Sequence, residues 1–147
     1  MSRRRKRLPK ELVTTYVESL SHDGRGVARV DGKTTFIDGA LPGETVIFRY
    51  LKTKSKYDEG CVEEIETPSS NRVAAKCQHY GVCGGCGLQH MSSEDQIRFK
   101  QESMLLNLKN IGDVVPVEIF SPLVCEPWGY RRKARIGVKY VHKRNAF

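Results

Sequence analysis

The sequence lacks any hydrophobic run long enough to span a bilayer, and it opens with basic residues rather than the apolar core of a secretory signal. Aromatic residues are also few, at 8% of the 147 residues, and hydrophobic residues reach only 39%. This composition provides enough apolar material for modest cores. We therefore expect a soluble, cytoplasmic protein built from two small units rather than from one large domain.

Acidic residues are scarce relative to basic ones. The chain has 17 Asp and Glu against 25 Lys and Arg, which gives a formal net charge of +8 at pH 7. Such an excess attracts polyanions and releases the counterions of their phosphates, so it favours a nucleic-acid partner. Charge alone does not separate RNA from DNA, or either from an anionic membrane. Residues 1–10 hold six basic side chains and no acid, which predicts a disordered, phosphate-binding arm.

Cysteines are few, but three of the five are clustered. Cys77, Cys83 and Cys86 lie within ten residues in a C-x5-C-x2-C pattern, in a stretch rich in glycine. The odd total and the missing secretory signal argue against disulfides, whereas thiolates at this spacing can hold one soft metal ion or cluster. One ligand position is left open. The candidates for it are His79 and His90 nearby, and Cys61 and Cys125 further away.

Residues 12–67 have the pattern of a small antiparallel β-barrel, with short β-branched runs separated by glycines. We expect five strands, at 12–20, 26–30, 33–37, 44–51 and 60–66. The pair Asp31-Gly32 predicts a tight hairpin turn. The loop at 52–57 carries three lysines and Tyr57, so it is either a solvated hairpin tip or a basic grip on a nucleic-acid backbone.

Beyond the linker at 67–70 and the cysteines, two further elements are predicted. Ser92 or Ser93 can cap a helix that runs to Gly112, with an apolar stripe typical of core packing. Residues 128–140 alternate basic and apolar side chains, which predicts a strand. That strand is either an edge protected by charge or a surface that faces RNA.

Two segments of the predicted barrel carry a family resemblance. Residues 21–29, from Ser21 to Arg29, and residues 40–44, Ala-Leu-Pro-Gly-Glu, resemble the TRAM domain, together with Thr35-Phe36-Ile37 between them. The TRAM domain is an OB-like barrel found on RNA-modifying enzymes. The resemblance implies RNA binding, whereas the residues by themselves indicate only a small basic barrel.

The order of barrel, cysteine cluster and the segment 128–135 resembles the N-terminal part of the iron–sulfur 23S rRNA (uracil-5-)-methyltransferases. In that family the clustered cysteines, here Cys77, Cys83 and Cys86, bind a [4Fe-4S] cluster with a fourth cysteine that follows the basic strand. This chain ends before that position. The resemblance implies 23S ribosomal RNA as partner, with neither DNA nor a membrane.

The family's catalytic parts have no counterpart in this sequence. Relatives bind S-adenosylmethionine in a Rossmann-like domain and use a cysteine and a carboxylate to form 5-methyluridine. We therefore assign no catalytic residue, and expect this chain alone neither to bind S-adenosylmethionine nor to methylate RNA. The expected fold is mainly β: a basic arm at 1–10, the TRAM-like barrel at 11–67, an iron–sulfur cysteine loop at 68–92, and a helix with the start of an incomplete α/β domain at 93–147.

Basic side chains along the chain are the predicted RNA contacts, mainly to phosphates, because few aromatic residues lie where they could read bases. They are Arg3, Arg4, Arg5, Arg25, Arg29, Lys52, Lys54, Lys56, Arg131, Arg132, Lys133 and Arg135. One alternative is a stand-alone RNA-binding module that holds zinc through Cys77, Cys83, Cys86 and His90. A weaker one is a redox protein that uses a cluster for electron transfer.

Overall fold

A computed structural model describes residues 8–133, 135 and 137–145 of the chain. The chain divides after Val117 into two units, each considered by itself. The first contains the strands β1 (Val13–Tyr16), β2 (Ser19–Leu20), β3 (Gly26–Val30), β4 (Lys33–Asp38), β5 (Thr45–Thr53) and β6 (Tyr57–Thr67), followed by the helix α1 (Ser93–Gly112). The second contains one short 3-10 helix, η1 (His142–Arg144), among its described residues.

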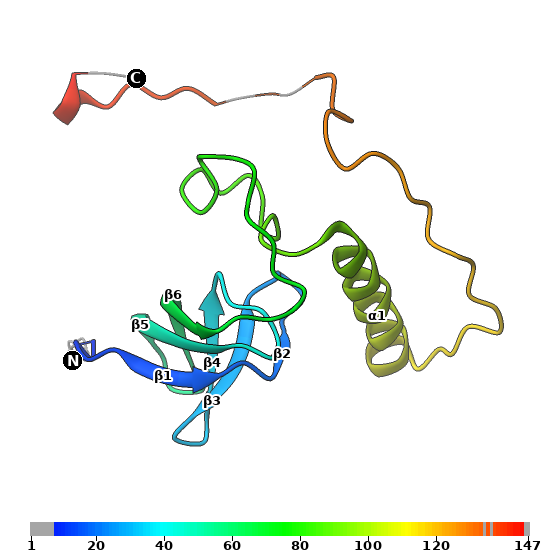
Figure 1. Ribbon diagram of the computed structural model, residues 1–147, viewed down its shortest axis with the longest axis horizontal. Helices are drawn as coiled ribbons and strands as arrows, with labels where there is room; N and C mark the ends of the chain where they lie inside the picture. Colours follow the sequence, from blue (N-terminus) through cyan, green and yellow to red (C-terminus); the bar gives the residue numbers. More distant parts are fainter. Residues whose placement is uncertain (1–7, 134, 136, 146–147) are drawn as a thin grey trace. The chain divides into compact units, whose positions relative to one another are not determined.

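The six strands form a single curled sheet in the order β1-β5-β6-β4-β3-β2 (Figure 1). Neighbouring strands are antiparallel except β4 and β6, which are parallel. The predicted first strand, 12–20, is interrupted at Val17 and Glu18. There the Val17 N–H donates to the Glu44 carbonyl (2.9 Å) and the Glu18 N–H donates to the Val27 carbonyl (2.8 Å). The chain thus changes partner from β5 to β3, and the two edges of the sheet are consecutive segments.

This arrangement confirms the mainly β, OB-like architecture predicted from the sequence. Three details differ. The predicted barrel was antiparallel, whereas β4 and β6 are parallel. The sheet has six strands because the first predicted strand is divided in two, and no ladder joins β1 to β2 among the described residues, so the barrel is not closed. The turn between β3 and β4 is as predicted, since Asp31 and Gly32 both have positive φ angles, 50° and 76°, as a type I′ hairpin requires.

The core lies inside the curl of the sheet. Its fully buried members are Val17, Ala28, Ile37, Ala40, Val46 and Phe48. Phe48 packs directly on the backbone of Gly60 in the neighbouring strand, where an ideal Cβ would come within 2.5 Å of the ring. Glycine is therefore required at position 60 by close approach, and burying the Phe48 side chain stabilises the sheet by about 3 kcal/mol.

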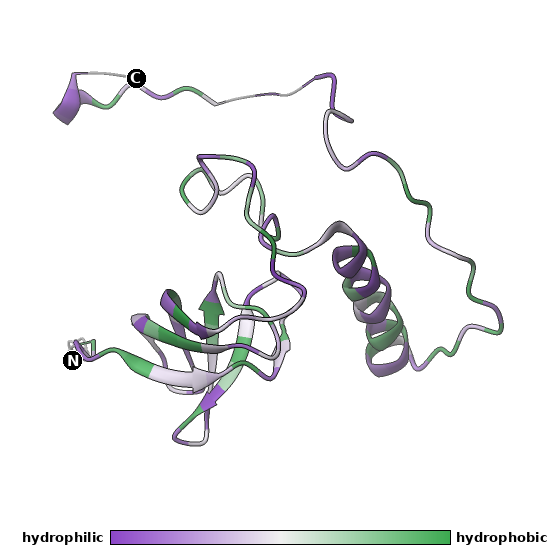
Figure 2. Cartoon of the chain, in the orientation of Figure 1, coloured by the Kyte–Doolittle hydropathy of each residue, from purple (hydrophilic) through white to green (hydrophobic). Residues whose placement is uncertain are grey.

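The helix α1 begins and ends as the sequence predicts. The Ser92 hydroxyl accepts a hydrogen bond from the Asp95 N–H, Glu94 and Asp95 occupy the first turn, and Asp113 ends the helix in a left-handed conformation. The predicted core packing of its apolar stripe is only partly observed. No α1 residue is fully buried: Ile97, Leu105 and Leu108 of the stripe are half-buried, and Met104 is 52% exposed. Figure 2 accordingly shows hydrophobic and hydrophilic residues side by side on α1.

The described residues of the second unit between 128 and 140 do not form the predicted strand, and nearly all of them are exposed. An isolated segment leaves its backbone groups to water unless a neighbouring strand accepts them, and no such neighbour occurs in the described part of this unit. No helix in the described part of the chain is both long and apolar enough to cross a membrane.

Candidate nucleic-acid interface and cysteine loop

The three clustered cysteines lie in a loop with a paired stem. Residues 71–73 run antiparallel to residues 90–92, with an isolated bridge between Arg72 and Met91. Two backbone hydrogen bonds of 2.9 and 3.0 Å lie on either side of this bridge. The loop therefore begins and ends at one place, although its interior has no regular secondary structure.

An ion pair fixes this stem to the sheet. Glu44, the residue before β5, is fully buried, and its two carboxylate oxygens accept hydrogen bonds from Arg72 Nε (2.5 Å) and Nη2 (2.8 Å). Arg72 also donates to the Gly39 carbonyl (2.7 Å). The backbone N–H groups of Leu41 and Ser69 complete the carboxylate's partners at 2.8 and 3.1 Å. A buried carboxylate with this many donors is well compensated, so the pair holds the loop in place.

The protonation of Glu44 follows from these contacts. Burial alone raises the pKa of its carboxyl, but Arg72 and the two backbone N–H groups outweigh burial and leave the pKa below its usual value. The carboxylate is therefore charged at neutral pH. In the sequence Glu44 stands out only as the last residue of the motif at 40–44, because its partner is 28 residues away and no local pattern connects them.

His90 and Tyr80 close the loop from inside. The Tyr80 hydroxyl lies 2.9 Å from the Gly87 carbonyl and also contacts His90 Nδ1. A carbonyl oxygen can only accept a hydrogen bond, so the Tyr80 hydroxyl donates its proton to the Gly87 carbonyl. The same hydroxyl oxygen then accepts a hydrogen bond from His90 Nδ1. Burial lowers the pKa of His90 to about 4, which keeps the ring neutral at pH 7. Its Nε2 has no hydrogen-bond partner among the described residues.

The loop has further contacts with its neighbours. Leu88 lies over the backbone of Gly24, in the turn between β2 and β3, where an ideal Cβ would come 3.1 Å from the leucine Cδ2. Gln96 on α1 donates to the carbonyls of Leu88 and Met91, both at 2.9 Å. The end of the loop is thus held by the sheet and by the first turns of the helix.

The cysteines themselves are not gathered into a metal site. Cys77 is half-buried, Cys83 and Cys86 are exposed, and all three are free thiols. The Gly85 N–H donates to Cys83 Sγ at 3.4 Å. No three His, Cys, Asp or Glu side chains form a metal-holding group among the residues that the structure describes. The donor chemistry fits a soft metal centre, whereas the predicted convergence of the three thiols is not formed.

The candidate fourth ligands are dispersed. His79 is exposed in the cysteine loop, and His90 is buried at its end, engaged by Tyr80. Cys61 lies in β6 of the sheet, where burial raises the pKa of its thiol. Cys125 is exposed in the second unit. None of these four residues is brought into a metal-holding group within the described ranges.

The predicted RNA contacts on the strands and turns of the sheet fall into two kinds. Arg29, Lys52 and Lys56 are exposed and form no salt bridge in the described part of the chain. Arg25 and Lys54 are held instead. Arg25 pairs with Asp23 at 2.7 Å, and Lys54 pairs with Glu59 at 3.2 Å. The first three can approach phosphates without breaking an existing pair.

Arg25 and Lys54 also frame two aromatic rings. Phe36 and Tyr57, on the paired strands β4 and β6, meet edge to face with centroids 5.4 Å apart. The Arg25 guanidinium lies 4.9 Å from the Phe36 centroid, and Lys54 Nζ lies 4.3 Å from that of Tyr57. We call these four side chains the cation–aromatic row. From the sequence we expected few aromatic residues to lie where they could read bases, and Phe36 stood out only as part of the Thr35-Phe36-Ile37 motif. In the structure Thr35 and Ile37 are buried, so the alternation along the strand points Phe36 outward.

The remaining predicted RNA contacts lie elsewhere. Arg131, Arg132, Lys133 and Arg135 are exposed in the second unit, with the Arg131 guanidinium 5.6 Å from the Tyr130 ring centroid. Arg3, Arg4 and Arg5 lie outside the described residues.

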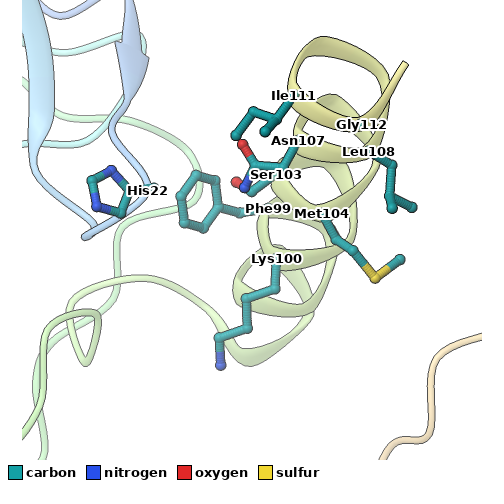
Figure 3. Close-up of a pocket in the computed structure, with 9 residues that line it drawn as sticks. All are labelled: His22, Phe99, Lys100, Ser103, Met104, Asn107, Leu108, Ile111 and Gly112. Carbon is teal, nitrogen blue, oxygen red and sulfur yellow. The ribbon is translucent and has the colours of Figure 1, made fainter. Parts of the chain in front are cut away.

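A groove between His22 and the face of α1 from Phe99 to Gly112 is drawn in Figure 3. Phe99, Met104 and Ile111 make it largely apolar, and His22, Lys100, Ser103 and Asn107 are its polar members.

Comparison with known proteins agrees with this architecture. The TRAM domain family matches residues 10–61, which cover the sheet from before β1 into β6. The sheet therefore corresponds to a TRAM domain.

Relatives that match most of the chain identify a more specific group of proteins. The chain is 52% identical over 133 residues to the 23S rRNA (uracil(1939)-C(5))-methyltransferase RlmD of Legionella pneumophila (strain Lens), a match covering 90% of this chain and 30% of the relative. It is 50% identical over 145 residues to the protein of that name from Hahella chejuensis, covering 99% of this chain and 32% of the relative. The chain thus spans about a third of the length of these relatives. The predicted resemblance to the N-terminal part of the 23S rRNA (uracil-5-)-methyltransferases is confirmed.

Proposed function

We propose that this chain is the RNA-recognising part of an S-adenosylmethionine-dependent 23S rRNA (uracil-5-)-methyltransferase, which forms 5-methyluridine. The observation that carries the proposal is the set of exposed, unpaired cations on a TRAM-type sheet: Arg29, Lys52 and Lys56. Sequence identity near 50% to proteins named for this activity supports it. The proposal includes a cytoplasmic location, with 23S ribosomal RNA as the partner.

The role of these cations is to attract and position the RNA. Each cation that meets a phosphate displaces a condensed counterion, so affinity falls steeply as salt rises. Phosphate contacts set the register of the RNA on the protein without reading its sequence. The sheet accordingly delivers a folded rRNA segment, while methyl transfer belongs to the catalytic parts of the complete enzyme.

Salt-dependent binding tests this function. We expect the 147-residue chain to bind 23S rRNA fragments. The logarithm of the association constant should fall linearly with the logarithm of the salt concentration between 50 and 200 mM. Substituting Arg29→Gln or Lys56→Gln removes one phosphate contact each and lowers the slope by about 0.7 to 0.9. Lys109→Gln on α1 is the matched control. Binding that ignores salt, or an equal change of slope for the control, contradicts the proposal.

We also propose that Cys77, Cys83 and Cys86 hold a [4Fe-4S] cluster. Three thiols in one glycine-rich loop, with the Gly85 N–H already directed at Cys83 Sγ, support this assignment. The chain's own contribution is the stem, which the Arg72–Glu44 pair anchors and which brings both ends of the loop together. A cluster, when bound, supplies tight cross-linking of these thiolates, and sites of this kind assemble around the metal.

Metal analysis distinguishes the cluster from zinc. After anaerobic purification, we expect visible iron–sulfur absorbance with iron and sulfide bound, all of which Cys83→Ser abolishes. Stoichiometric zinc that His90→Gln removes supports instead the Cys3His site. Cys125→Ser is the control, since that thiol lies in the second unit. A protein free of iron and zinc under these conditions contradicts both assignments.

The chain alone is proposed to have no methyltransferase activity. A cofactor domain of the Rossmann type needs on the order of 100 residues, with several strands that each lead into a helix. Within the described residues, the part after the cysteine loop has only α1 and η1. Calorimetry with S-adenosylmethionine and a tritium-transfer assay on rRNA fragments test this, and either measurable binding or methyl transfer contradicts it.

A further inference from the structure

The cation–aromatic row suggests a second mode of RNA contact besides phosphate binding. We infer that Phe36 and Tyr57, framed by Arg25 and Lys54, form a stacking site for one unpaired RNA base. This inference rests on the proposed RNA-binding function and extends it from phosphate contacts to a base contact. The juxtaposition that carries it is an outward-facing aromatic pair with a cation over each ring.

The two rings are positioned by the sheet. Phe36 pairs across the strands with Glu59, and Tyr57 pairs with Thr34, so both rings belong to the parallel β4–β6 ladder. The side chains next to each ring along its strand, at Thr35 and Ile37 and at Asp58, are buried, which directs Phe36 and Tyr57 to the outer face. Both rings are half-buried, and a ring fixed by backbone register costs little conformational entropy when it binds a ligand.

The two cations distinguish this site from a pair of aromatic rings that only stabilises the sheet, because such a pair needs no cation beside each ring. Arg25 comes from the turn before β3, whereas Lys54 lies in the turn before β6, three residues before Tyr57, whose hydroxyl its Nζ also contacts. A planar guanidinium can stack on a base as well as on a ring, and the flanking phosphates of a bound strand provide new partners for both cations. Asp23 and Glu59 hold these cations in the free protein, and RNA phosphates replace them when RNA binds.

The geometry favours an unpaired base over a duplex. In a duplex the faces of the bases are already stacked and only edges are accessible, whereas loops and bulges expose whole base faces. Stacking on aromatic rings tolerates every base, so this site contributes affinity for single-stranded segments without choosing a sequence.

Fluorescence of a stacked base tests the inference. Single-stranded RNA nonamers carrying 2-aminopurine at successive positions are titrated with the full 147-residue chain. We expect quenching at one or two positions, and no quenching when the complementary strand is annealed. Phe36→Leu and Tyr57→Leu are each expected to remove the quenching and to weaken binding about tenfold, without changing the salt slope. Arg29→Gln should change the slope and leave the quenching intact.

Matched controls separate stacking from a loss of folding. Tyr16→Leu removes an aromatic side chain that is 58% exposed on β1, and we expect no change in quenching. Phe36→Tyr keeps a ring and should keep the signal. An abasic site at the quenched position should weaken wild-type binding but leave binding by Phe36→Leu unchanged. Thermal unfolding of each variant confirms that the sheet is intact.

The outcomes are distinguishable. If the wild-type chain binds RNA with a normal salt slope but Phe36→Leu and Tyr57→Leu leave affinity and quenching unchanged, the stacking site is wrong and the phosphate-binding function stands. If the wild-type chain binds no RNA at any salt concentration, both are wrong. Quenching lost equally in Tyr16→Leu also overturns the inference.

Discussion

The sheet and the segment 128–140 have similar sequence patterns, but their described residues differ in structure. Both contain alternating apolar and polar residues, yet the alternation gives strands with a buried face in the sheet and exposed chain without a strand in the described residues of 128–140. Val46 and Phe48 are fully buried and lie on β5, which pairs with β1 on one side and β6 on the other. Phe120 and Val138 in the second unit are 79% and 72% exposed. A pattern of period two thus becomes a strand only where neighbouring strands are available for its hydrogen bonds and apolar face.

The largest expected effect comes from truncating the core of the sheet. Phe48→Ala leaves a cavity beside Gly60 and should lower the free energy of unfolding by about 3 to 5 kcal/mol, measured by urea denaturation of the full chain. Phe120→Ala, the matched change in the second unit, should stay within about 0.5 kcal/mol because that ring is exposed. Similar losses for the two variants would show that the contrast between the regions is wrong.

Breaking the Arg72–Glu44 ion pair, which anchors the cysteine loop, should have the next largest effect on stability. Arg72→Met leaves the buried Glu44 carboxylate without its charged partner, at a cost of about 3 kcal/mol. We expect limited proteolysis to cut the cysteine loop faster in this variant. Arg131→Met, which loses only an exposed contact with Tyr130, should cost about 0.5 kcal/mol. Unchanged proteolysis of Arg72→Met argues against the anchoring role.

The Arg72–Glu44 ion pair also predicts that folding stability depends on pH. The pKa of Glu44 is lowered in the folded protein, so its contribution is fully present above the unfolded value of about 4.3 and is lost as the pH falls through the lowered folded value. Glu44→Gln should therefore be less stable than the wild type at pH 7, with the difference shrinking in acid. Urea denaturation between pH 7 and pH 2.5 measures this, and a difference that grows in acid has the wrong sign.

Adding one methyl group compares the regions more finely. At Gly60, a Cβ would lie 2.5 Å from the Phe48 ring and 2.8 Å from the Arg49 carbonyl oxygen, so Gly60→Ala should cost about 1 to 3 kcal/mol through overpacking. Gly137 in the second unit has no heavy atom within 4 Å of the same position. Gly137→Ala is accordingly expected to leave the urea midpoint unchanged. A stabilised Gly60→Ala variant would show that the close packing is misplaced.

The smallest effect concerns RNA affinity. Lys54→Gln should weaken binding to all RNAs alike, about threefold at 150 mM salt, because phosphate contacts position the RNA without specifying its sequence. Lys133→Gln should have a smaller effect, since its exposed side chain lies on a segment without regular structure and must be ordered on binding. Anisotropy titrations with two unrelated RNAs measure both, and a loss confined to one RNA contradicts the phosphate assignment for Lys54.

Local signals in the sequence were sufficient for several elements. The hairpin turn at Asp31-Gly32 and the Ser92 cap of α1 depend on residues close together in the chain, and both occur as predicted. The strand at 128–140 was predicted from an equally regular pattern, but its partners are not in the described residues of its unit. Alternation identifies residues that are able to form a strand, and it says nothing about the neighbour that the strand requires.

The mainly β class, the basic composition, the cysteine cluster and the likeness to the rRNA methyltransferases can be predicted from the amino-acid sequence, because composition, spacing and motifs are properties of short segments. Three contacts could be found only in the folded chain: Glu44 holds Arg72 across 28 residues, His90 is engaged by Tyr80 inside the loop, and Phe36 meets Tyr57 between two cations. These contacts join residues distant in the chain. Their existence depends on strand register and on the curl of the sheet, which no single segment encodes.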